Sequence, residues 1–152
     1  MLTIKFLTVQ HNSELYKQTV RLRYEILRRP LGLTFTDAQL SAEDKDIHLA
    51  GIDQNRAICC CLILTPLDGK TVQMRQVAVA KQEQGKGTGR QLVEYSEKIT
   101  LQNGYDKIML HARDTAVEFY LKLGYEPEGE QFFEVGIPHL QMRKNLLINE
   151  SK

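Results

Sequence analysis

One segment of the sequence, QVAVAKQEQGKGTGRQLVEY at residues 76–95, constrains the fold more than any other. An apolar run is followed by three alternating glycines, Gly85, Gly87 and Gly89, and then by the periodic pattern of a helix. Glycines between a strand and a helix permit positive φ and let the backbone approach a ligand closely. Because the first N–H groups of a helix and its dipole attract anions, the segment predicts a strand–loop–helix unit that binds a phosphate group.

The spacing of the glycines excludes the two common nucleotide-binding motifs. A P-loop requires G-x-x-x-x-G-K-[ST], but Lys86 is followed by Gly87, and Ala80 stands at the first glycine position. A dinucleotide motif requires G-x-G-x-x-G, whereas this loop reads G-x-G-x-G. Lys86 and Arg90 add positive charge on either side of the loop. The sequence therefore favours a phosphate or pyrophosphate ligand of another kind, with a plain glycine-rich turn as the alternative.

Strand and helix patterns alternate along the rest of the chain. The expected strands lie at residues 2–9, 47–52, 56–66, 71–79, 107–112, 131–135 and 140–146. A first helix, capped by Asn12 or Ser13, is expected to stop near Arg29, because Pro30 follows. The last helix is expected to begin at Asp114 or Thr115 through a capping box. Its buried face would comprise Ala116, Phe119, Tyr120 and Leu123. The order predicts one mixed α/β domain over residues 1–152.

Composition excludes several classes of protein. The 152 residues carry 20 Lys and Arg against 19 Asp and Glu, a formal charge of +1, which argues against a broadly basic nucleic-acid surface. The longest apolar run, residues 57–64, is far shorter than the ~20 residues that cross a bilayer, and the N-terminal pattern reads as a strand. Cys59, Cys60 and Cys61 lack metal-binding spacing and are interpreted as core residues in a reducing compartment, with a reactive thiol as the alternative. We expect a cytoplasmic protein without metal, membrane or nucleic-acid partners.

Two blocks of sequence resemble the GNAT (general N-acetyltransferase) superfamily. Gln84-Gly85-Lys86-Gly87-Thr88-Gly89 matches its Q/R-x-x-G-x-G/A motif, and residues 116–125, AVEFYLKLGY, match its A-x-x-F-Y-x-x-x-G-F/Y segment. The tail FFEVGIPHLQMRKN resembles a bacterial branch with G-I-P-H followed by M-x-K. The resemblance implies a central, mostly antiparallel twisted sheet of about seven strands with helices on both faces.

The resemblance also implies acetyl-CoA as the acyl donor. By this resemblance the backbone of Gln76, Val77, Ala78 and Val79 would pair with the pantetheine arm. The pyrophosphate would be surrounded by Gln84, Gly85, Lys86, Gly87, Thr88, Gly89 and Arg90. Phe119 would lie along the donor. Arg113 stands where many members have asparagine, so a contact to a phosphate or a carbonyl is expected from it instead.

For catalysis, the resemblance places Tyr120 at the position of the general acid. The departing thiolate needs a proton, which a phenol with pKa ~10 can donate, although a core aromatic residue is the alternative interpretation. Some members carry a glutamate on the strand before the glycine loop, where it would serve as the base, but Gln73, Arg75 and Gln76 stand there. Glu134 and His139 are the remaining candidates for the base, with His111 similar; His11 and His48 are interpreted as surface or turn residues.

The expected function is acetyl transfer by direct attack of a primary amine, on a small molecule or a peptide. Asp37, Glu43, Asp44 and Asp46 give the loop after the first helix an acidic character, which suggests a cationic acceptor; a solvated loop is the alternative, and Arg21, Arg28 and Arg29 equally permit an anionic one. A non-catalytic acyl-CoA-binding regulatory module and an interaction protein with a plain turn are the rival hypotheses. Because members of the family often form dimers, the resemblance favours a homodimer. No feature of the sequence itself specifies the oligomeric state.

Overall fold

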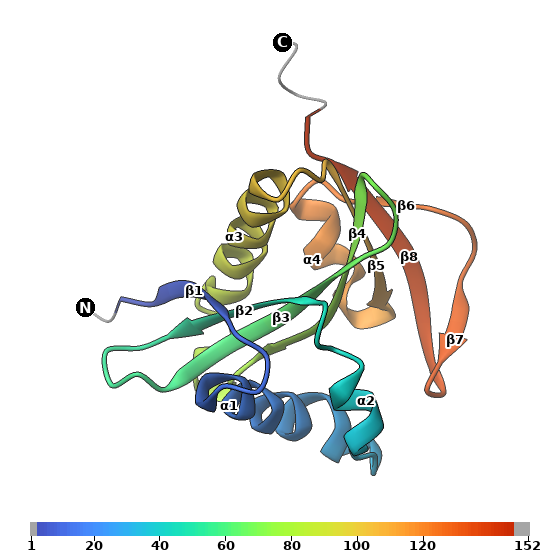
Figure 1. The fold of residues 1–152 in the computed structure, drawn as a ribbon. Helices are drawn as coiled ribbons and strands as arrows, with labels where there is room; N and C mark the ends of the chain where they lie inside the picture. Colours follow the sequence, from blue (N-terminus) through green and yellow to red (C-terminus); the bar gives the residue numbers. More distant parts are fainter. Residues whose placement is uncertain (1–2, 148–152) are drawn as a thin grey trace. The chain divides into compact units, whose positions relative to one another are not determined.

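The computed structural model describes residues 3–147 and shows a mixed α/β fold whose sheet is mostly antiparallel, as expected (Figure 1). The chain divides into two compact units. The first contains the residues up to Thr65 together with Gln76–Ser96, and the second contains Pro66–Arg75 and the residues from Glu97 onward. Strand β4 (Thr71–Val79) and helix α3 (Thr88–Gln102) therefore each contribute residues to both units.

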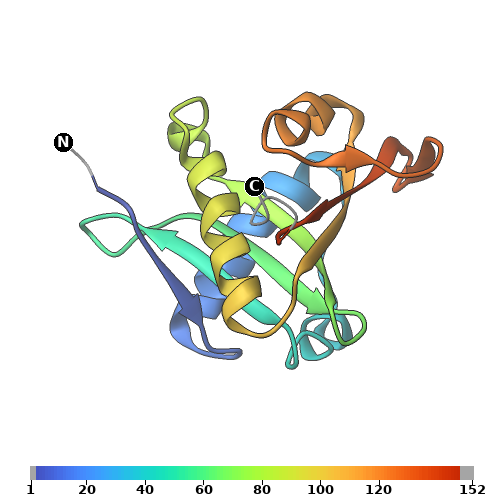
Figure 2. The same cartoon turned by 90° about the horizontal axis from the view of Figure 1, so that it is seen from above.

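The first unit is built on strands in the order β1-β2-β3-β4. Its elements are β1 (Lys5–Val9), α1 (Glu14–Arg23), a π-helical turn η1 (Tyr24–Arg28), a 3₁₀ turn η2 (Arg29–Leu31), α2 (Asp37–Ser41), β2 (Ile47–Ile52), β3 (Ile58–Pro66), η3 (Lys81–Glu83) and the start of α3. β2 pairs antiparallel with both β1 and β3. Helices α1 and α3 lie on opposite faces of these strands (Figures 1 and 2). Leu2, assigned to the first expected strand, lies outside the described residues.

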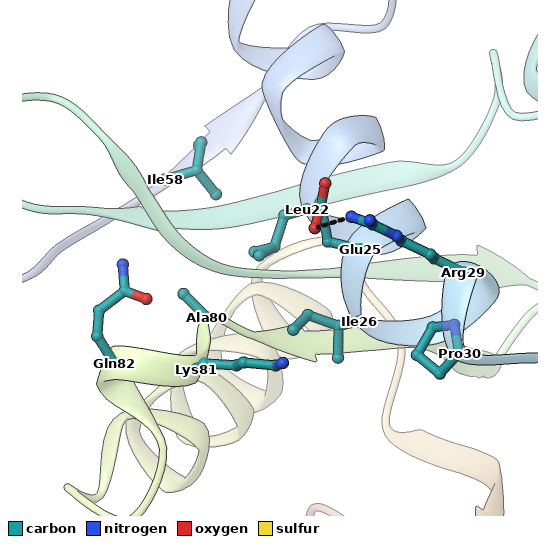
Figure 3. Close-up of a pocket in the computed structure, with 9 residues that line it drawn as sticks. All are labelled: Leu22, Glu25, Ile26, Arg29, Pro30, Ile58, Ala80, Lys81 and Gln82. Carbon is teal, nitrogen blue, oxygen red and sulfur yellow. Dashed lines mark hydrogen bonds and ion pairs between the residues drawn. The ribbon is translucent and has the colours of Figure 1, made fainter.

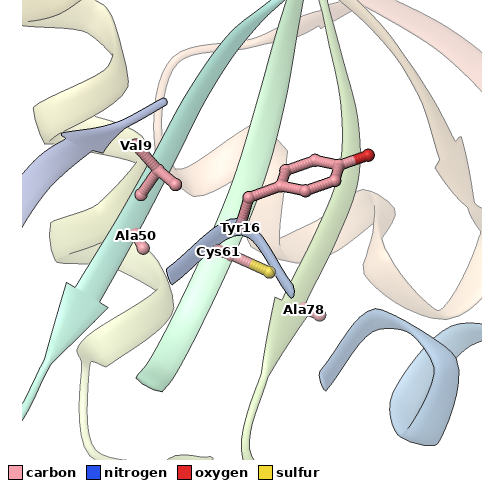
Figure 4. Packing of buried hydrophobic residues seen from close by; sticks show 5 residues of the cluster. All are labelled: Val9, Tyr16, Ala50, Cys61 and Ala78. Carbon is pink, nitrogen blue, oxygen red and sulfur yellow. The ribbon is translucent and has the colours of Figure 1, made fainter. Parts of the chain in front are cut away.

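Period-two alternation along the strands separates two apolar layers. On the α1 face, Cys61 packs in a cluster with Val9, Tyr16, Ala50 and Ala78 (Figure 4). All three cysteines are free and buried, and burial raises the pKa of the Cys59 thiol to about 11 and those of Cys60 and Cys61 to about 12. The interpretation of these cysteines as core residues is confirmed.

A buried polar network joins α1 to the segment before β2. Arg23 is 1% exposed, and its Nη1 and Nη2 donate to the two carboxylate oxygens of Glu43 at 3.0 and 2.6 Å. The Tyr16 hydroxyl donates to Glu43 Oε1 at 2.7 Å, and Nε2 of the buried His48 donates to the Glu43 carbonyl at 2.8 Å. Two expectations are therefore wrong, because Glu43 is a buried ion-pair partner rather than part of an acidic loop surface, and His48 is a core residue.

The second unit contains the first half of β4, the end of α3, β5 (Lys107–Arg113), η4 (Asp114–Ala116), α4 (Val117–Lys122), β6 (Glu126–Pro127), β7 (Phe132–Glu134) and β8 (Ile137–Asn145). β5 pairs in parallel with β4 and antiparallel with β8, which also pairs with β6 and β7. The expected capping box is wrong, because no side chain caps α4; instead the Asp114 carboxylate accepts from the Thr115 N–H at 3.0 Å. Strand β8 begins at Ile137 rather than at the expected Leu140, because a turn of only two residues separates it from β7.

That turn between β7 and β8 consists of Val135 and Gly136, both with positive φ, 47° and 75°. Two-residue hairpins of this kind favour Asn-Gly, and a β-branched residue at positive φ is strained. We expect Val135→Asn to raise the free energy of unfolding by about 1 kcal/mol. Urea denaturation of both proteins checks this result. Val135→Ala is the control, since it removes the branching without supplying asparagine's tolerance of positive φ, and an equal gain from alanine would contradict the turn argument.

Candidate active site

The glycine loop of the first unit has the backbone conformation that its sequence predicts. Gly85 and Gly87 have φ of 78° and 85°, and a Cβ atom added to Gly85 would meet nothing within 4 Å. Conformation rather than crowding therefore requires glycine here. The side-chain amide of Gln84 donates to the Val79 carbonyl at 3.0 Å and so ties the loop to the end of β4. Helix α3 begins directly after the loop at the buried Thr88.

The charges around the start of α3 suit an anionic ligand. Lys86 and Arg90 are exposed, and Arg90 Nη1 lies 3.5 Å from Glu94 Oε2 on the next helical turn. An exposed pair at that distance is weak, so Arg90 retains its ability to contact a ligand. The first N–H groups of a helix as long as α3 have no partner within the helix and carry the positive end of its dipole. The loop can therefore bind a phosphate group through backbone donors and two cations.

Strand β4 has an irregular backbone before it reaches this loop. Its pairing with β5 runs from Thr71 to Met74 among the described residues, and Gln76 then has a φ of 57°, which is uncommon for a residue other than glycine. The side-chain oxygen of Gln76 is buried and has no hydrogen-bond partner. A strained backbone conformation with an unsatisfied polar group is typical of a functional position.

A cavity of about 710 Å³ opens beside the end of β4 in the first unit (Figure 3). Its lining residues are Leu22, Glu25, Ile26, Arg29, Pro30, Ile58, Ala80, Lys81 and Gln82. Arg29 Nη1 lies 3.3 Å from Glu25 Oε2, and the Lys81 side chain extends along the cavity towards Ile26 (Figure 3). The volume is that of a small-molecule site. Sequence reasoning missed this cavity because it joins residues from α1, η1, η2, β3 and the segment after β4.

In the second unit, Tyr120 lies on α4 with 6% of its surface exposed. Its ring contacts those of Phe119 and Tyr125 edge-on, at centroid distances of 5.0 and 5.6 Å. Burial raises the pKa of Tyr120 to about 12, so its hydroxyl stays protonated and able to donate at neutral pH. Phe119 is 36% exposed, so the expectation that it belongs to the buried face is wrong.

The candidate bases lie where β5, β7 and β8 pair. His111 Nδ1 donates to Glu134 Oε1 at 2.8 Å, and Nδ1 of the buried His139 donates to the Ile137 carbonyl at 2.8 Å. The Phe132 ring lies against both imidazoles, at centroid distances of 4.9 and 5.9 Å. Each histidine thus has Nδ1 engaged and Nε2 as its remaining acceptor when neutral. Arg113, the last residue of β5, is opposite His139 in the register.

Comparison with known proteins identifies the family. A family model described as an acetyltransferase (GNAT) domain matches residues 36–146, most of the chain. This chain belongs to the GNAT acetyltransferase family. The uncharacterized protein YyaT of Bacillus subtilis is 33% identical over 81 residues, 53% of this chain and 55% of that protein. The aligned stretches span about half the length of the curated relatives that the chain matches.

Solved structures show the same fold at low sequence identity. Escherichia coli ElaA superimposes with a TM-score of 0.81 at 20% identity, covering 94% of this chain and 100% of ElaA. A GNAT family acetyltransferase from Elizabethkingia anophelis, solved with acetyl-CoA bound, gives a TM-score of 0.73 at 17% identity, covering 94% of this chain and 98% of that protein. The GNAT fold expected from the two sequence blocks is confirmed.

The described residues also bear on metal binding and on membrane spanning. Within residues 3–147, no three His, Cys, Asp or Glu side chains gather where a metal ion could be held. No helix in that part of the chain is both long and apolar enough to span a membrane.

The sequence singled out Glu134 and His139 separately, whereas the structure pairs Glu134 with His111. The alternation of β5 alone could not signal this contact, because Glu134 lies 23 residues further along the chain.

Proposed function

We propose that this GNAT domain transfers the acetyl group of acetyl-CoA to a primary amine. The observation that carries the proposal is the loop before α3, where Gly85 and Gly87 have positive φ and Lys86 and Arg90 flank the first turn of the helix. Backbone donors and cations in this arrangement suit a pyrophosphate. The Elizabethkingia anophelis acetyltransferase of the same fold was solved with acetyl-CoA bound, which supports the same donor here.

Three groups of residues support the assignment of the donor. The space over Gly85 is open, so the loop backbone is accessible to a phosphate. Beyond its last pairing with β5, β4 continues through the backbone of Gln76–Val79, which would hydrogen-bond the pantetheine arm. In the second unit, Phe119, exposed on α4, and Arg113 are assigned to the donor by the family resemblance. These assignments take the family resemblance residue by residue.

The donor supplies an acetyl thioester, and the chain's own groups handle the protons. Tyr120, kept protonated by burial, donates its phenolic proton to the departing thiolate. The acceptor amine must lose a proton before it attacks, and Glu134 or His139 takes it. The contact with His111 gives Glu134 an imidazole through which this proton can pass, while His139 has its own free Nε2. The two routes are alternatives within one mechanism.

The acceptor is an amine on a small molecule or a peptide. The finding that Glu43 is buried weakens the case for a cationic acceptor, since Asp37 and Asp44 remain as the exposed acids of that segment. We further propose that residues 1–152 act as one acetyltransferase domain, that it forms a homodimer, and that it functions in the cytoplasm. Its three buried free thiols support a reducing compartment.

Donor binding is tested by thermal unfolding with acetyl-CoA, with CoA and ATP as comparisons. A ligand that binds only the folded chain adds about 2.7 kcal/mol at ~100 times its dissociation constant, which raises Tm by roughly 5–10 °C for a chain of this size. We expect a clear rise with acetyl-CoA and with CoA but not with ATP. Lys86→Ala combined with Arg90→Ala should reduce the rise, whereas Lys98→Ala, an exposed lysine later in α3, should leave it unchanged.

Each other outcome has a defined meaning. No rise at saturating acetyl-CoA would show that the loop is a plain turn and would overturn the proposal. A rise without amine-dependent release of CoA, across a panel of primary amines, would favour the non-catalytic acyl-CoA-binding module. Release that depends on one class of amine would identify the acceptor.

A further inference from the structure

Lys144, the lysine of the M-x-K segment in β8, makes several polar contacts, and the proposed catalytic roles use none of them. Its Nζ donates to the Leu123 carbonyl at 2.7 Å and lies 3.1 and 3.2 Å from the two carboxylate oxygens of Glu97. Both side chains are about one-fifth exposed, 22% for Lys144 and 18% for Glu97. Since an ammonium has three donors, these three acceptors satisfy it completely. Lys144 therefore has a defined position at the end of α4.

The same contacts explain the Gly124-Tyr125 pair that closes the second family block. Gly124 has φ of 95°, and a Cβ atom there would lie 3.2 Å from Lys144 Cε, so any other residue would be strained and would crowd the lysine. The Tyr125 hydroxyl donates to Glu97 Oε2 at 2.9 Å, and its ring lies 5.5 Å from Lys144 Nζ. Lys144, Glu97 and Tyr125 thus form one connected group, which we call the α4 anchor.

Tyr120 is joined to the α4 anchor through the backbone and through its ring. The Tyr125 N–H donates to the Tyr120 carbonyl at 3.0 Å, and the two rings meet edge-on at 5.6 Å. Helix α4 has only six residues and no side-chain N-cap. A helix this short is not stable by itself, so contacts from outside must hold it. A cation at its C-terminus also meets the free carbonyls and the negative end of its dipole.

We propose that Lys144 and Glu97 are positioning residues, which fix the C-terminal turn of α4 and thereby aim the Tyr120 hydroxyl. The inference rests on the proposed role of Tyr120 as the proton donor. Lys144 and Glu97 touch neither donor nor acceptor in this scheme; they act through Tyr125 and the α4 backbone. Without the α4 anchor, the Tyr120 hydroxyl is still present, but its ring is no longer held in one orientation.

The test uses Lys144→Met, which keeps the aliphatic stem and removes the three donors. Its matched control is Lys122→Met, an exposed lysine on α4 itself. We expect Lys144→Met to lower kcat by about 10-fold to 10²-fold, the effect of a small misplacement of a reacting group. KM for acetyl-CoA should change less than about twofold, because Tyr120 does not hold the donor in this scheme. Lys144→Arg should restore part of the rate. The assay measures CoA release with the best amine of the panel.

Two further measurements separate positioning from a general loss of stability. In a Tyr120→Phe background, Lys144→Met should have no further effect on kcat, whereas independent contributions would multiply. Nuclear magnetic resonance of ring-labelled tyrosine, with the Tyr120 signal assigned by Tyr120→Phe, should show that signal moved or broadened in Lys144→Met. The signals of Tyr16 and Tyr24 in the first unit should stay unchanged.

These outcomes distinguish failure of the inference from failure of the proposed function. The positioning role would be overturned if the two substitutions lowered kcat independently, so that their factors multiply in the double variant. An unmoved Tyr120 signal in a folded Lys144→Met protein would overturn it as well. If Tyr120→Phe alone leaves kcat unchanged, the role of Tyr120 as acid is wrong, while the resonance experiment still reports whether Lys144 orients the ring. If Lys144→Met does not fold, Tyr125→Phe and Glu97→Gln replace it, with the same expected coupling to Tyr120.

Discussion

Replacement of Tyr120 by phenylalanine is expected to lower kcat by about 10² to 10⁴-fold, the usual contribution of a general acid. The substitution removes one hydroxyl and keeps the ring that packs against Phe119 and Tyr125. Binding of acetyl-CoA, followed by thermal shift, should therefore be retained. The measurement is CoA release with the best amine acceptor, at saturating acetyl-CoA. A decrease of less than about twofold would exclude Tyr120 as the donor of the catalytic proton.

The pH dependence gives a second check on Tyr120. The acid form is the neutral phenol, which is present below the pKa and lost as the pH rises through it. Because burial raises that pKa to about 12, Tyr120 should cause no loss of kcat between roughly pH 7 and 10. Tyr105→Phe is the matched control, because Tyr105 is a half-buried tyrosine of the second unit with no assigned role in the site. This substitution should leave both kcat and its pH profile unchanged.

Glu43→Gln is expected to lower the free energy of unfolding by about 3–5 kcal/mol, because it leaves the buried guanidinium of Arg23 without its counter-charge. Arg23 is 1% exposed and holds both carboxylate oxygens of Glu43. Glutamine has nearly the same shape, so the loss measures charge rather than packing. Urea denaturation at neutral pH checks this. Asp44→Asn, at the exposed neighbouring acid, should stay within about 0.5 kcal/mol of the unmodified protein.

The sign of the pH effect follows from the surroundings of Glu43. Burial alone would raise its pKa, but the hydrogen bonds from Arg23 and Tyr16 outweigh burial and lower it below the ordinary value of 4.5. The ion pair therefore stabilises the fold fully above that value, and its contribution is lost as the pH falls through the lowered pKa. The difference between the two proteins should be largest at neutral pH and shrink in acid. A difference that does not change with pH would show that the ionisation of Glu43 does not cause the loss.

Local features of the fold and the site could be predicted from the sequence because they depend on neighbouring residues. Alternating apolar residues place β2 at Ile47–Ile52 and β4 at Thr71–Val79, as expected. The positive φ of Gly85 and Gly87 follows from glycine's freedom, and Ser13 caps α1 as its hydroxyl predicts. The GNAT blocks are local for the same reason, since each lies within a single loop or a single helix with its following turn.

Long-range contacts could not be predicted, because no periodicity specifies which distant side chains meet. Glu43 resembles its acidic neighbours in the sequence, and only its ion pair with Arg23, 20 residues earlier, makes it a core residue. Lys144 belongs to the M-x-K segment, but only the packing of β8 brings it to Glu97, 47 residues away. The sequence alone determined most of the strands, the glycine loop and the family, but not the short β6 or the start of β8. The tertiary structure decided which charges are buried and what holds α4, since burial and pairing depend on the folded arrangement of distant segments.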